Sequence, residues 1–181
     1  MLVLASQSPR RREILAAAGL DFVVRISNVP ENHTAGESPD EYVRRLAEAK
    51  ARAVEANAGD LVLGADTVVV VDNHILEKPL DHADASRMLN LLSGREHDVI
   101  TGICLLGDGS RIVDSARTRV HFATLSKREI EDYVNSGEPM GKAGGYAIQG
   151  RANKFIDRIE GEYFNVMGLP IALIYRHLKT L

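Results

Sequence analysis

The chain has 181 residues and a formal net charge of −3, with 45% hydrophobic and 26% charged residues, which is typical of one globular domain and disfavours nucleic acid and anionic membranes as partners. No apolar run approaches the length of a membrane span, and the first residues lack the regions of a signal peptide. The lone cysteine, Cys104, cannot form an internal disulfide, so we expect a cytoplasmic protein.

Strands and helices mix along the chain, and apolar periodicity and capping residues predict their positions. In chain order the sequence predicts a strand at 2–5, a helix at 9–18, a strand at 21–26, a helix at 39–56, strands at 61–71 and 75–77, a helix at 82–92, strands at 98–106 and 111–122 joined by a turn at 107–109, a helix at 127–136, a Gly-rich loop at 137–150, a strand at 155–156, a loop at 161–170 and a helix at 170–178. We therefore expect an α/β fold with a mixed, twisted sheet and flanking helices, two-lobed with a central cleft.

Residues 61–71, LVLGADTVVVV, are apolar β-formers with one carboxylate, Asp66, near their centre. An ionised carboxylate buried in a strand costs on the order of several kcal/mol unless a cation, a metal or hydrogen bonds compensate it. A structural aspartate with satisfied hydrogen bonds is one interpretation. We favour a catalytic carboxylate, because no partner lies nearby in the sequence.

The helix predicted at residues 9–18 carries three arginines, Arg10, Arg11 and Arg12, in its first turn. The helix dipole disfavours cations there. Solvated arginines that pair with Glu13 would explain the pattern without a function. Helix N-terminal amides with arginines also make a phosphate site, and the strand–Ser–Pro–helix context favours this second interpretation.

Lys50 falls on the apolar face of the helix predicted at residues 39–56, in register with Val43 and Leu46. Its ammonium either reaches past that face to water or has a function. The sequence holds no P-loop, dinucleotide, zinc or acyl-transfer motif. Several cations with the carboxylates Glu31 and Asp66 suit a polyphosphate, a hard divalent metal and an activated water.

Short motifs along almost the whole chain follow the order found in one known family. They are SQSPRR at 6–11, GADTVV at 64–69, KP at 78–79, SGR at 93–95, TG at 101–102, KAG at 142–144, YAIQG at 146–150, NV at 165–166 and GLP at 168–170. Together they resemble the Maf family of nucleoside triphosphate pyrophosphatases. Two positions differ: Gly141 stands where an acidic residue commonly precedes the lysine, and Pro30 precedes Glu31 where an acidic residue is usual.

The resemblance implies a single Maf-like nucleotide pyrophosphatase domain over residues 1–181, with a fold like that of Maf and inosine triphosphatases. It implies hydrolysis of dTTP and UTP to the monophosphate and pyrophosphate, with Mg²⁺ or Mn²⁺. It also implies a role for each candidate site residue: Asp66 as proton acceptor; Glu31 and Asp66 as metal ligands; Arg10, Thr67 and Gln149 in substrate specificity; Ser6, Ser8, Arg11, Lys50, Lys78 and Lys142 as phosphate contacts.

The resemblance leaves alternatives open. Family members are typically homodimers and are linked to arrest of septum formation, so a regulator of septation that binds nucleotide without turnover is one alternative. A sister subfamily acts on 7-methyl-GTP. The amide of Gln149 could pair with uracil or thymine, but equally with adenine, or it could only satisfy loop backbone.

Overall fold

The computed structural model describes residues 1–107 and 109–181, and the chain divides into two compact units. Unit 1 consists of Met1–Thr67, Ile100–Ala116 and Phe164–Leu181, and unit 2 of Val68–Val99 and Arg117–Tyr163. The units are in keeping with the predicted lobes, whereas the cleft between them stays a prediction. Asp108 of the predicted turn at 107–109 lies outside the described residues.

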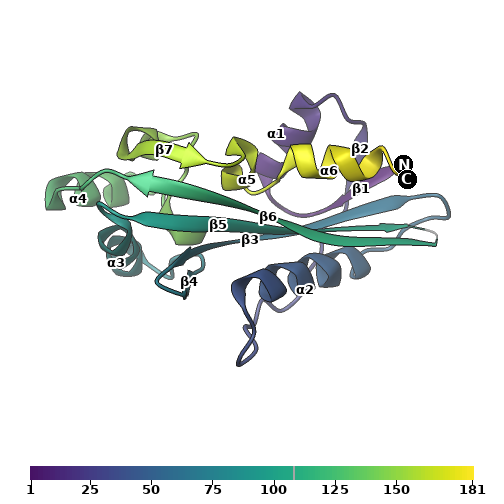
Figure 1. Ribbon diagram of the computed structural model, residues 1–181, viewed down its shortest axis with the longest axis horizontal. Helices are drawn as coiled ribbons and strands as arrows, with labels where there is room; N and C mark the ends of the chain where they lie inside the picture. The colour runs from purple at the N-terminus through teal and green to yellow at the C-terminus, as the bar shows by residue number, and fades with distance from the viewer. Residues whose placement is uncertain (108) are drawn as a thin grey trace. The chain divides into compact units, whose positions relative to one another are not determined.

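The helices and strands follow the predicted order (Figure 1). The strands are β1 (Leu2–Ala5), β2 (Phe22–Val24), β3 (Leu61–Val71), β4 (His74–Leu76), β5 (Glu96–Gly107), β6 (Ser110–Phe122) and β7 (Ile156–Glu160). The helices are α1 (Pro9–Ala17), α2 (Pro39–Arg52), α3 (His82–Leu92), α4 (Lys127–Asn135), α5 (Tyr163–Met167) and α6 (Ile171–Leu178), with 3₁₀ turns η1 (Ala143–Gly145) and η2 (Arg151–Phe155). None of the helices in these described residues is long and apolar enough to span a membrane.

Over the described residues the seven strands form one sheet in the order β2-β1-β3-β5-β6-β7, with β4 paired to β3. β1 pairs in parallel with both β2 and β3, whereas the pairs β3–β4 and β6–β7 are antiparallel. The β3–β4 connection turns through Asp72 and Asn73, which both have positive φ, as a tight hairpin requires. The prediction of a mixed sheet with flanking helices is confirmed.

Capping residues account for where most helices begin. Ser38 and Glu41 form a reciprocal capping box at α2, and Ser126 and Glu129 form another at α4, as predicted. Ser8 lies at the N-cap of α1, but its side chain makes no capping hydrogen bond. Pro9, whose missing N–H and fixed φ suit the first helical position, is the signal that correctly located this helix.

Several boundaries differ from the predictions. α2 ends at Arg52 instead of near residue 56, and β2 covers three residues instead of 21–26. The predicted strand at 155–156 begins at Ile156, after a 3₁₀ turn. The loop predicted at 161–170 contains the helix α5. The sequence did not predict this helix, because its five residues span little more than one turn and are too few to show a helical periodicity.

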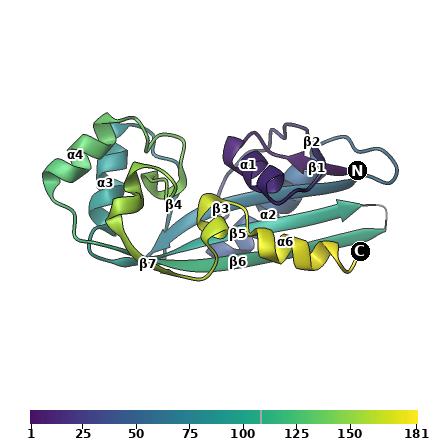
Figure 2. The ribbon, with the colours of Figure 1, turned by 90° about the horizontal axis from the view of Figure 1, so that it is seen from above.

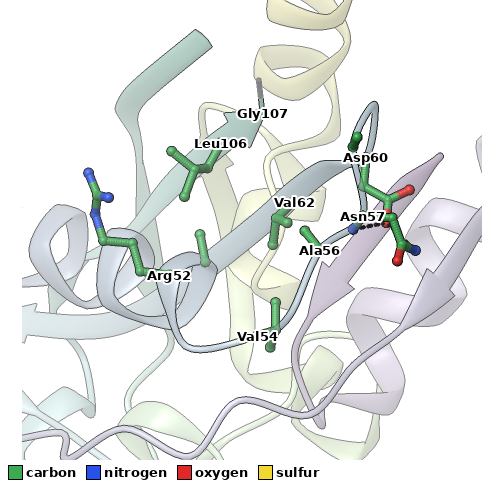
Figure 3. A pocket seen from close by; sticks show the side chains of 10 residues that line it. Arg52, Val54, Ala56, Asn57, Asp60, Val62, Leu106 and Gly107 are labelled. Atoms are coloured by element: carbon green, nitrogen blue, oxygen red, sulfur yellow. Dashed lines mark hydrogen bonds between the residues drawn. The ribbon is translucent and has the colours of Figure 1, made fainter. Parts of the chain in front are cut away.

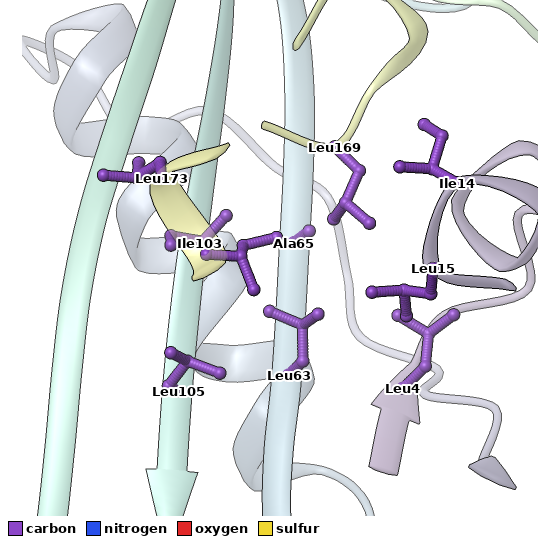
Figure 4. Close-up of a cluster of buried hydrophobic side chains, with 10 residues drawn as sticks. Leu4, Ile14, Leu15, Leu63, Ala65, Ile103, Leu105, Leu169 and Leu173 are labelled. Carbon is purple, nitrogen blue, oxygen red and sulfur yellow. The ribbon is translucent and has the colours of Figure 1, made fainter. Parts of the chain in front are cut away.

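The core of unit 1 covers both faces of its strands. On one face α1 and α6 bury aliphatic side chains against β1, β3 and β5 (Figure 4), namely Leu4, Ile14, Leu15, Leu63, Ala65, Ile103, Leu105, Leu169, Leu173 and Ile174. On the other face α2 packs Ala47 and Ala51 against β1, β3 and β5. Strand β3 is therefore buried on both sides, as its unbroken apolar sequence predicts.

Helix α2 lies unusually close to the strands because two of the strand residues are glycines. A Cβ on Gly64 would lie 2.1 Å from the carbonyl oxygen of Ala47, and a Cβ on Gly102 would lie 2.4 Å from that of Val43. No side chain fits in either place. The two glycines thus set the height of α2 above β3 and β5.

In unit 2, α3 and α4 pack side by side (Figure 2), and the unit also contains a cluster of aromatic rings. His97, Phe122 and Tyr146 meet edge to face, with ring centroids 4.9–5.4 Å apart. Tyr133 of α4 meets Phe155 in the same way at 5.5 Å. This cluster supports the Gly-rich segment from Gly137 to Gly150.

Candidate active site

Asp66 on β3 and Lys50 on α2 form a buried ion pair, with Lys50 Nζ 2.6 Å from Asp66 Oδ1. Only 7% of Asp66 and 8% of Lys50 is exposed. The same ammonium lies 2.6 Å from Glu31 Oε1, so it joins two carboxylates. Lys50 therefore does not extend past the apolar face to bulk water. The cation that compensates the charge of Asp66 is Lys50, 16 residues earlier in the sequence.

Burial raises the pKa of Asp66 above its usual range, and this is the dominant influence on the group. The charge and hydrogen bond of Lys50 act in the opposite direction, as does the charge of Arg11, while Glu31 adds to the rise. This shift has the direction that a proton acceptor needs.

The loop that carries Glu31 is tied to α2 through Tyr42, whose hydroxyl donates to the carbonyl oxygen of Glu31 at 3.1 Å. Tyr42 is fully buried, whereas Glu31 is exposed. Sequence analysis did not single out Tyr42. Two features of the sequence could have indicated Tyr42. It lies eight residues before Lys50, which places both on one helix face, and its hydroxyl gives it a polar tip.

Arg11 is buried, and its guanidinium bridges three segments of unit 1. Its Nε donates to Gly168 O at 2.8 Å, one terminal nitrogen donates to Ser6 Oγ at 3.2 Å and Ala65 O at 2.9 Å, and the other donates to Thr67 Oγ1 at 3.1 Å. Desolvation by burial lowers its pKa from the usual value. The arginine is therefore not a solvated surface cation, and its contact with phosphate stays a prediction.

The predicted specificity residue Thr67 also lies in this network. Its hydroxyl is 3.0 Å from that of Thr101 on β5, and Thr101 donates to the carbonyl oxygen of Asn165 at 3.3 Å. Gly168 contributes its carbonyl oxygen and has a positive φ of 109°. Residues of the TG, NV and GLP motifs thus take part in one hydrogen-bond network with Arg11 and Thr67. The spacing of these motifs along the chain could not reveal this network.

The remaining candidates divide between the units. In unit 1, Ser6 is buried beside Arg11, whereas Ser8 and Arg10 are half-buried at the start of α1. Unit 2 holds the exposed residues Lys78 and Gln149 and the half-buried Lys142, whose Nζ donates to the carbonyl oxygen of Glu138 at 2.6 Å. In unit 1, direct hydrogen bonds thus join these candidates in two groups, one of Ser6, Arg11 and Thr67 and the other of Glu31, Lys50 and Asp66.

The carboxylates of Glu31 and Asp66 offer hard oxygen ligands of the kind that Mg²⁺ and Mn²⁺ prefer. Among the described residues, no group of three or more His, Cys, Asp or Glu side chains is placed to hold a metal ion. Mg²⁺ often binds through one or two carboxylates together with substrate phosphates. The pair therefore fits an ion that binds with a triphosphate better than a permanently bound one.

A pocket of about 410 Å³ lies elsewhere in unit 1, beyond the end of α2 (Figure 3). Its lining includes Val54, Val62 and Leu106, with Arg52 and Asp60 among its polar residues. None of the candidate site residues lines it. Its position gives no support for a nucleotide site there.

The sequence matches the Maf family, described as Maf-like protein, over residues 1–181. It is 55% identical over 179 residues to the dTTP/UTP pyrophosphatase of Koribacter versatilis, covering 98% of this chain and 93% of the relative. The dTTP/UTP pyrophosphatase of Vibrio cholerae is 52% identical over 172 residues, covering 94% and 92%. The Staphylococcus aureus Ham1 protein has a similar fold, with a TM-score of 0.55 at 15% identity over 99% of this chain and 98% of that one.

Proposed function

The chain belongs to the Maf family, and we propose that it is a nucleoside triphosphate pyrophosphatase that hydrolyses dTTP and UTP to the monophosphate and pyrophosphate. Relatives that carry this name match nearly the whole chain. The observation that carries the proposal is the buried Lys50–Asp66 pair with Glu31 beside it. A buried base next to a cation suits phosphoanhydride hydrolysis.

In the proposed reaction, Asp66 accepts a proton from the attacking water. The water oxygen bonds to a phosphorus of the α–β anhydride, the bridging P–O bond breaks, and pyrophosphate leaves. Burial raises the pKa of Asp66, and a shift in this direction favours proton transfer from the water to its carboxylate. The salt bridge to Lys50 keeps the carboxylate oriented before the substrate binds.

Lys50 contributes a phosphate contact as well. An ammonium has three N–H donors, and two of those of Lys50 serve Asp66 and Glu31. We assign the third to a phosphate oxygen of the substrate. Glu31 and Asp66 would hold Mg²⁺ or Mn²⁺ together with the triphosphate, and the ion would supply positive charge against the phosphate oxygens.

Substrate choice is assigned to Gln149, with Arg10 and Thr67. An exposed glutamine amide offers both a donor and an acceptor, which suit the adjacent carbonyl and N–H of uracil or thymine. Thr67 already uses its hydroxyl on Arg11 and Thr101. We therefore assign Thr67 an indirect effect on substrate choice, through its hydrogen bonds to Arg11 and Thr101.

The decisive experiment measures kcat/KM for dTTP, UTP, CTP, dGTP, ITP and 7-methyl-GTP, with and without magnesium, on wild type and Gln149→Ala. We expect dTTP and UTP to be the best substrates and the preference to fall in the variant. A best rate with 7-methyl-GTP would place the chain in the sister subfamily. Binding of dTTP without release of pyrophosphate would favour the septation regulator instead.

A homodimer and a link to septum formation are further proposals, which rest on the family alone, and a cytoplasmic location is another, which rests on the lone cysteine. Sedimentation of the purified chain at several concentrations tests the first of these. A dimer is expected, and a constant monomer mass would contradict it.

A further inference from the structure

We propose that Glu138 and Tyr133 position the segment Tyr146–Gly150 and thereby set the selectivity of the enzyme for its base. The inference rests on the proposed role of Gln149 in that segment. Glu138 follows α4 and Tyr133 lies on it. Neither residue belongs to the group around Asp66, and both act through the backbone that carries Gln149.

Glu138 and Tyr133 together hold the backbone on both sides of Gln149. Both oxygens of Glu138 accept the main-chain N–H of Arg151, at 2.8 and 3.1 Å. The hydroxyl of Tyr133 donates to Glu138 Oε1 at 2.9 Å and accepts the N–H of Ala147 at 3.1 Å. The two anchored amides lie two residues before and two residues after Gln149, so its place depends on this network.

The sequence makes room for this carboxylate at Gly150. A Cβ on Gly150 would lie 2.4–2.6 Å from the carboxylate atoms of Glu138, so the carboxylate would have to move if residue 150 carried a side chain. Ala147 and Ile148 are buried, whereas Gln149 is exposed. A rigid backbone below an exposed amide is the arrangement that lets a side chain read a base edge.

Glu138 also contacts the predicted phosphate-binding residue of the same loop. Its carbonyl oxygen accepts the Nζ of Lys142 at 2.6 Å, and its own N–H donates to Ser136 Oγ at 3.3 Å. Ser136 in turn donates to the carbonyl oxygen of Tyr133. Glu138 is therefore held by the end of α4 and contacts both Lys142 and the backbone next to Gln149.

The test measures kcat and KM for dTTP, UTP, dGTP and ITP on wild type, Glu138→Ala, Glu138→Gln and Tyr133→Phe. We expect Glu138→Ala to lower the ratio of kcat/KM for dTTP over dGTP by about 10- to 100-fold, because small displacements of a binding group have effects of this size. Tyr133→Phe should lower it less. Glu138→Gln should retain most of the ratio, since an amide oxygen at the Oε1 position still accepts from Tyr133 and Arg151.

Glu129→Ala is the matched control, because Glu129 caps the same helix through Ser126 and, among the described residues, has no hydrogen bond to the segment Tyr146–Gly150. It should lower the melting temperature without changing the ratio. Equal ratios in Glu138→Ala and wild type, or an equal loss in Glu129→Ala, would overturn the proposal. If Glu138→Ala does not fold, Tyr133→Phe carries the test, and an unchanged ratio there overturns it.

The outcomes also separate this inference from the proposed function. A wild type that does not prefer dTTP and UTP refutes the function. A wild type with that preference and a Glu138→Ala variant that keeps it refute only the positioning role.

Discussion

The ammonium of Lys50 and the carboxylate of Asp66 meet at 2.6 Å with both side chains buried. Removing one member of a buried pair typically costs about 3–5 kcal/mol, because the other charge is left uncompensated. Each side chain of the pair therefore holds the other in place. It also means that a variant of either residue must be tested for folding and for chemistry separately.

Asp66→Asn is expected to lower kcat for dTTP by at least about 100-fold, the lower end for loss of a positioned base. The asparagine keeps the shape and a carbonyl acceptor for Lys50, so the fold and nucleotide binding should be retained. Turnover measured alongside calorimetric binding of dTTP decides this. Near wild-type turnover would show that Asp66 is structural.

Glu48→Gln serves as the control for Asp66→Asn. Glu48 lies on the same helix as Lys50 and accepts hydrogen bonds from Arg111 and Arg52, which lower its pKa to about 2. It contacts none of the site residues named here. Its loss should leave kcat unchanged, so a fall in kcat in both variants would indicate disturbance of α2 instead of loss of a base.

Lys50→Met is expected to move the acid limb of the profile of kcat against pH to higher pH. Burial raises the pKa of Asp66 and Lys50 opposes that rise, so removal of the cation raises the pKa further. The ionised base is then lost at a higher pH as the solution is acidified. A limb that stays in place, or moves to lower pH, would contradict this assignment.

The same raised pKa predicts how stability depends on pH. The folded pKa of Asp66 lies above its unfolded value, so folding takes up a proton in the window between them. The contribution to stability is complete below the unfolded pKa and is lost as pH rises through the folded one. Denaturant unfolding of Asp66→Asn should show a smaller loss of stability with rising pH across that window than wild type.

Arg11→Met is expected to lower the free energy of unfolding by about 3 kcal/mol or more, because two carbonyl oxygens and two hydroxyls lose a buried donor. The neighbouring exposed Arg12 gives the control, and Arg12→Met should change stability by about 0.5 kcal/mol at most. Urea titration measures both. Equal effects would mean that the network around Arg11 adds nothing to stability.

Arg11 also retains its predicted phosphate role, which calorimetry tests. A greater loss of affinity for the triphosphate than for the free nucleoside in Arg11→Met would support phosphate contact. Equal losses would mean that the arginine acts only on the protein.

Gly102→Ala is expected to destabilise the protein by about 1–3 kcal/mol or more and to lower kcat, because the new methyl group would push α2 away from β5. The helix carries Lys50, which would then lie farther from Asp66. Gly59→Ala is the comparison: its φ of 82° brings strain, but no atom lies within 4 Å of the new Cβ. That variant should lose stability without losing kcat.

The sequence predicted β3 to the residue, and also the capping boxes of α2 and α4, because each depends on neighbours close in the chain. It also singled out Asp66 and Lys50 separately. It could not pair them, since their approach depends on how α2 packs over Gly64 and Gly102. Long-range packing of this kind leaves no local pattern to find.

Contacts between residues far apart in the chain also explain which site residues the sequence did not predict. The carbonyl oxygen of Gly168 is a partner of Arg11 across 157 residues, and no periodicity indicates it. Glu138 appeared only as part of a Gly-rich loop, because its contact with Arg151 depends on how that loop folds back on itself. The family motifs include Thr101, Asn165 and Gly168, but only the structure shows which residues these three contact.

The division of unit 1 into three separate stretches has a consequence for synthesis on the ribosome. Strand β1 and helix α1 leave the ribosome first, yet the core that covers them includes Leu169, Leu173 and Ile174 from the stretch Phe164–Leu181. Unit 2 lies between these stretches in the chain and is complete once Tyr163 has emerged. The nascent chain must therefore hold its first apolar segments incompletely covered until translation of the last stretch, and the unit that carries Asp66 is the later of the two to be finished.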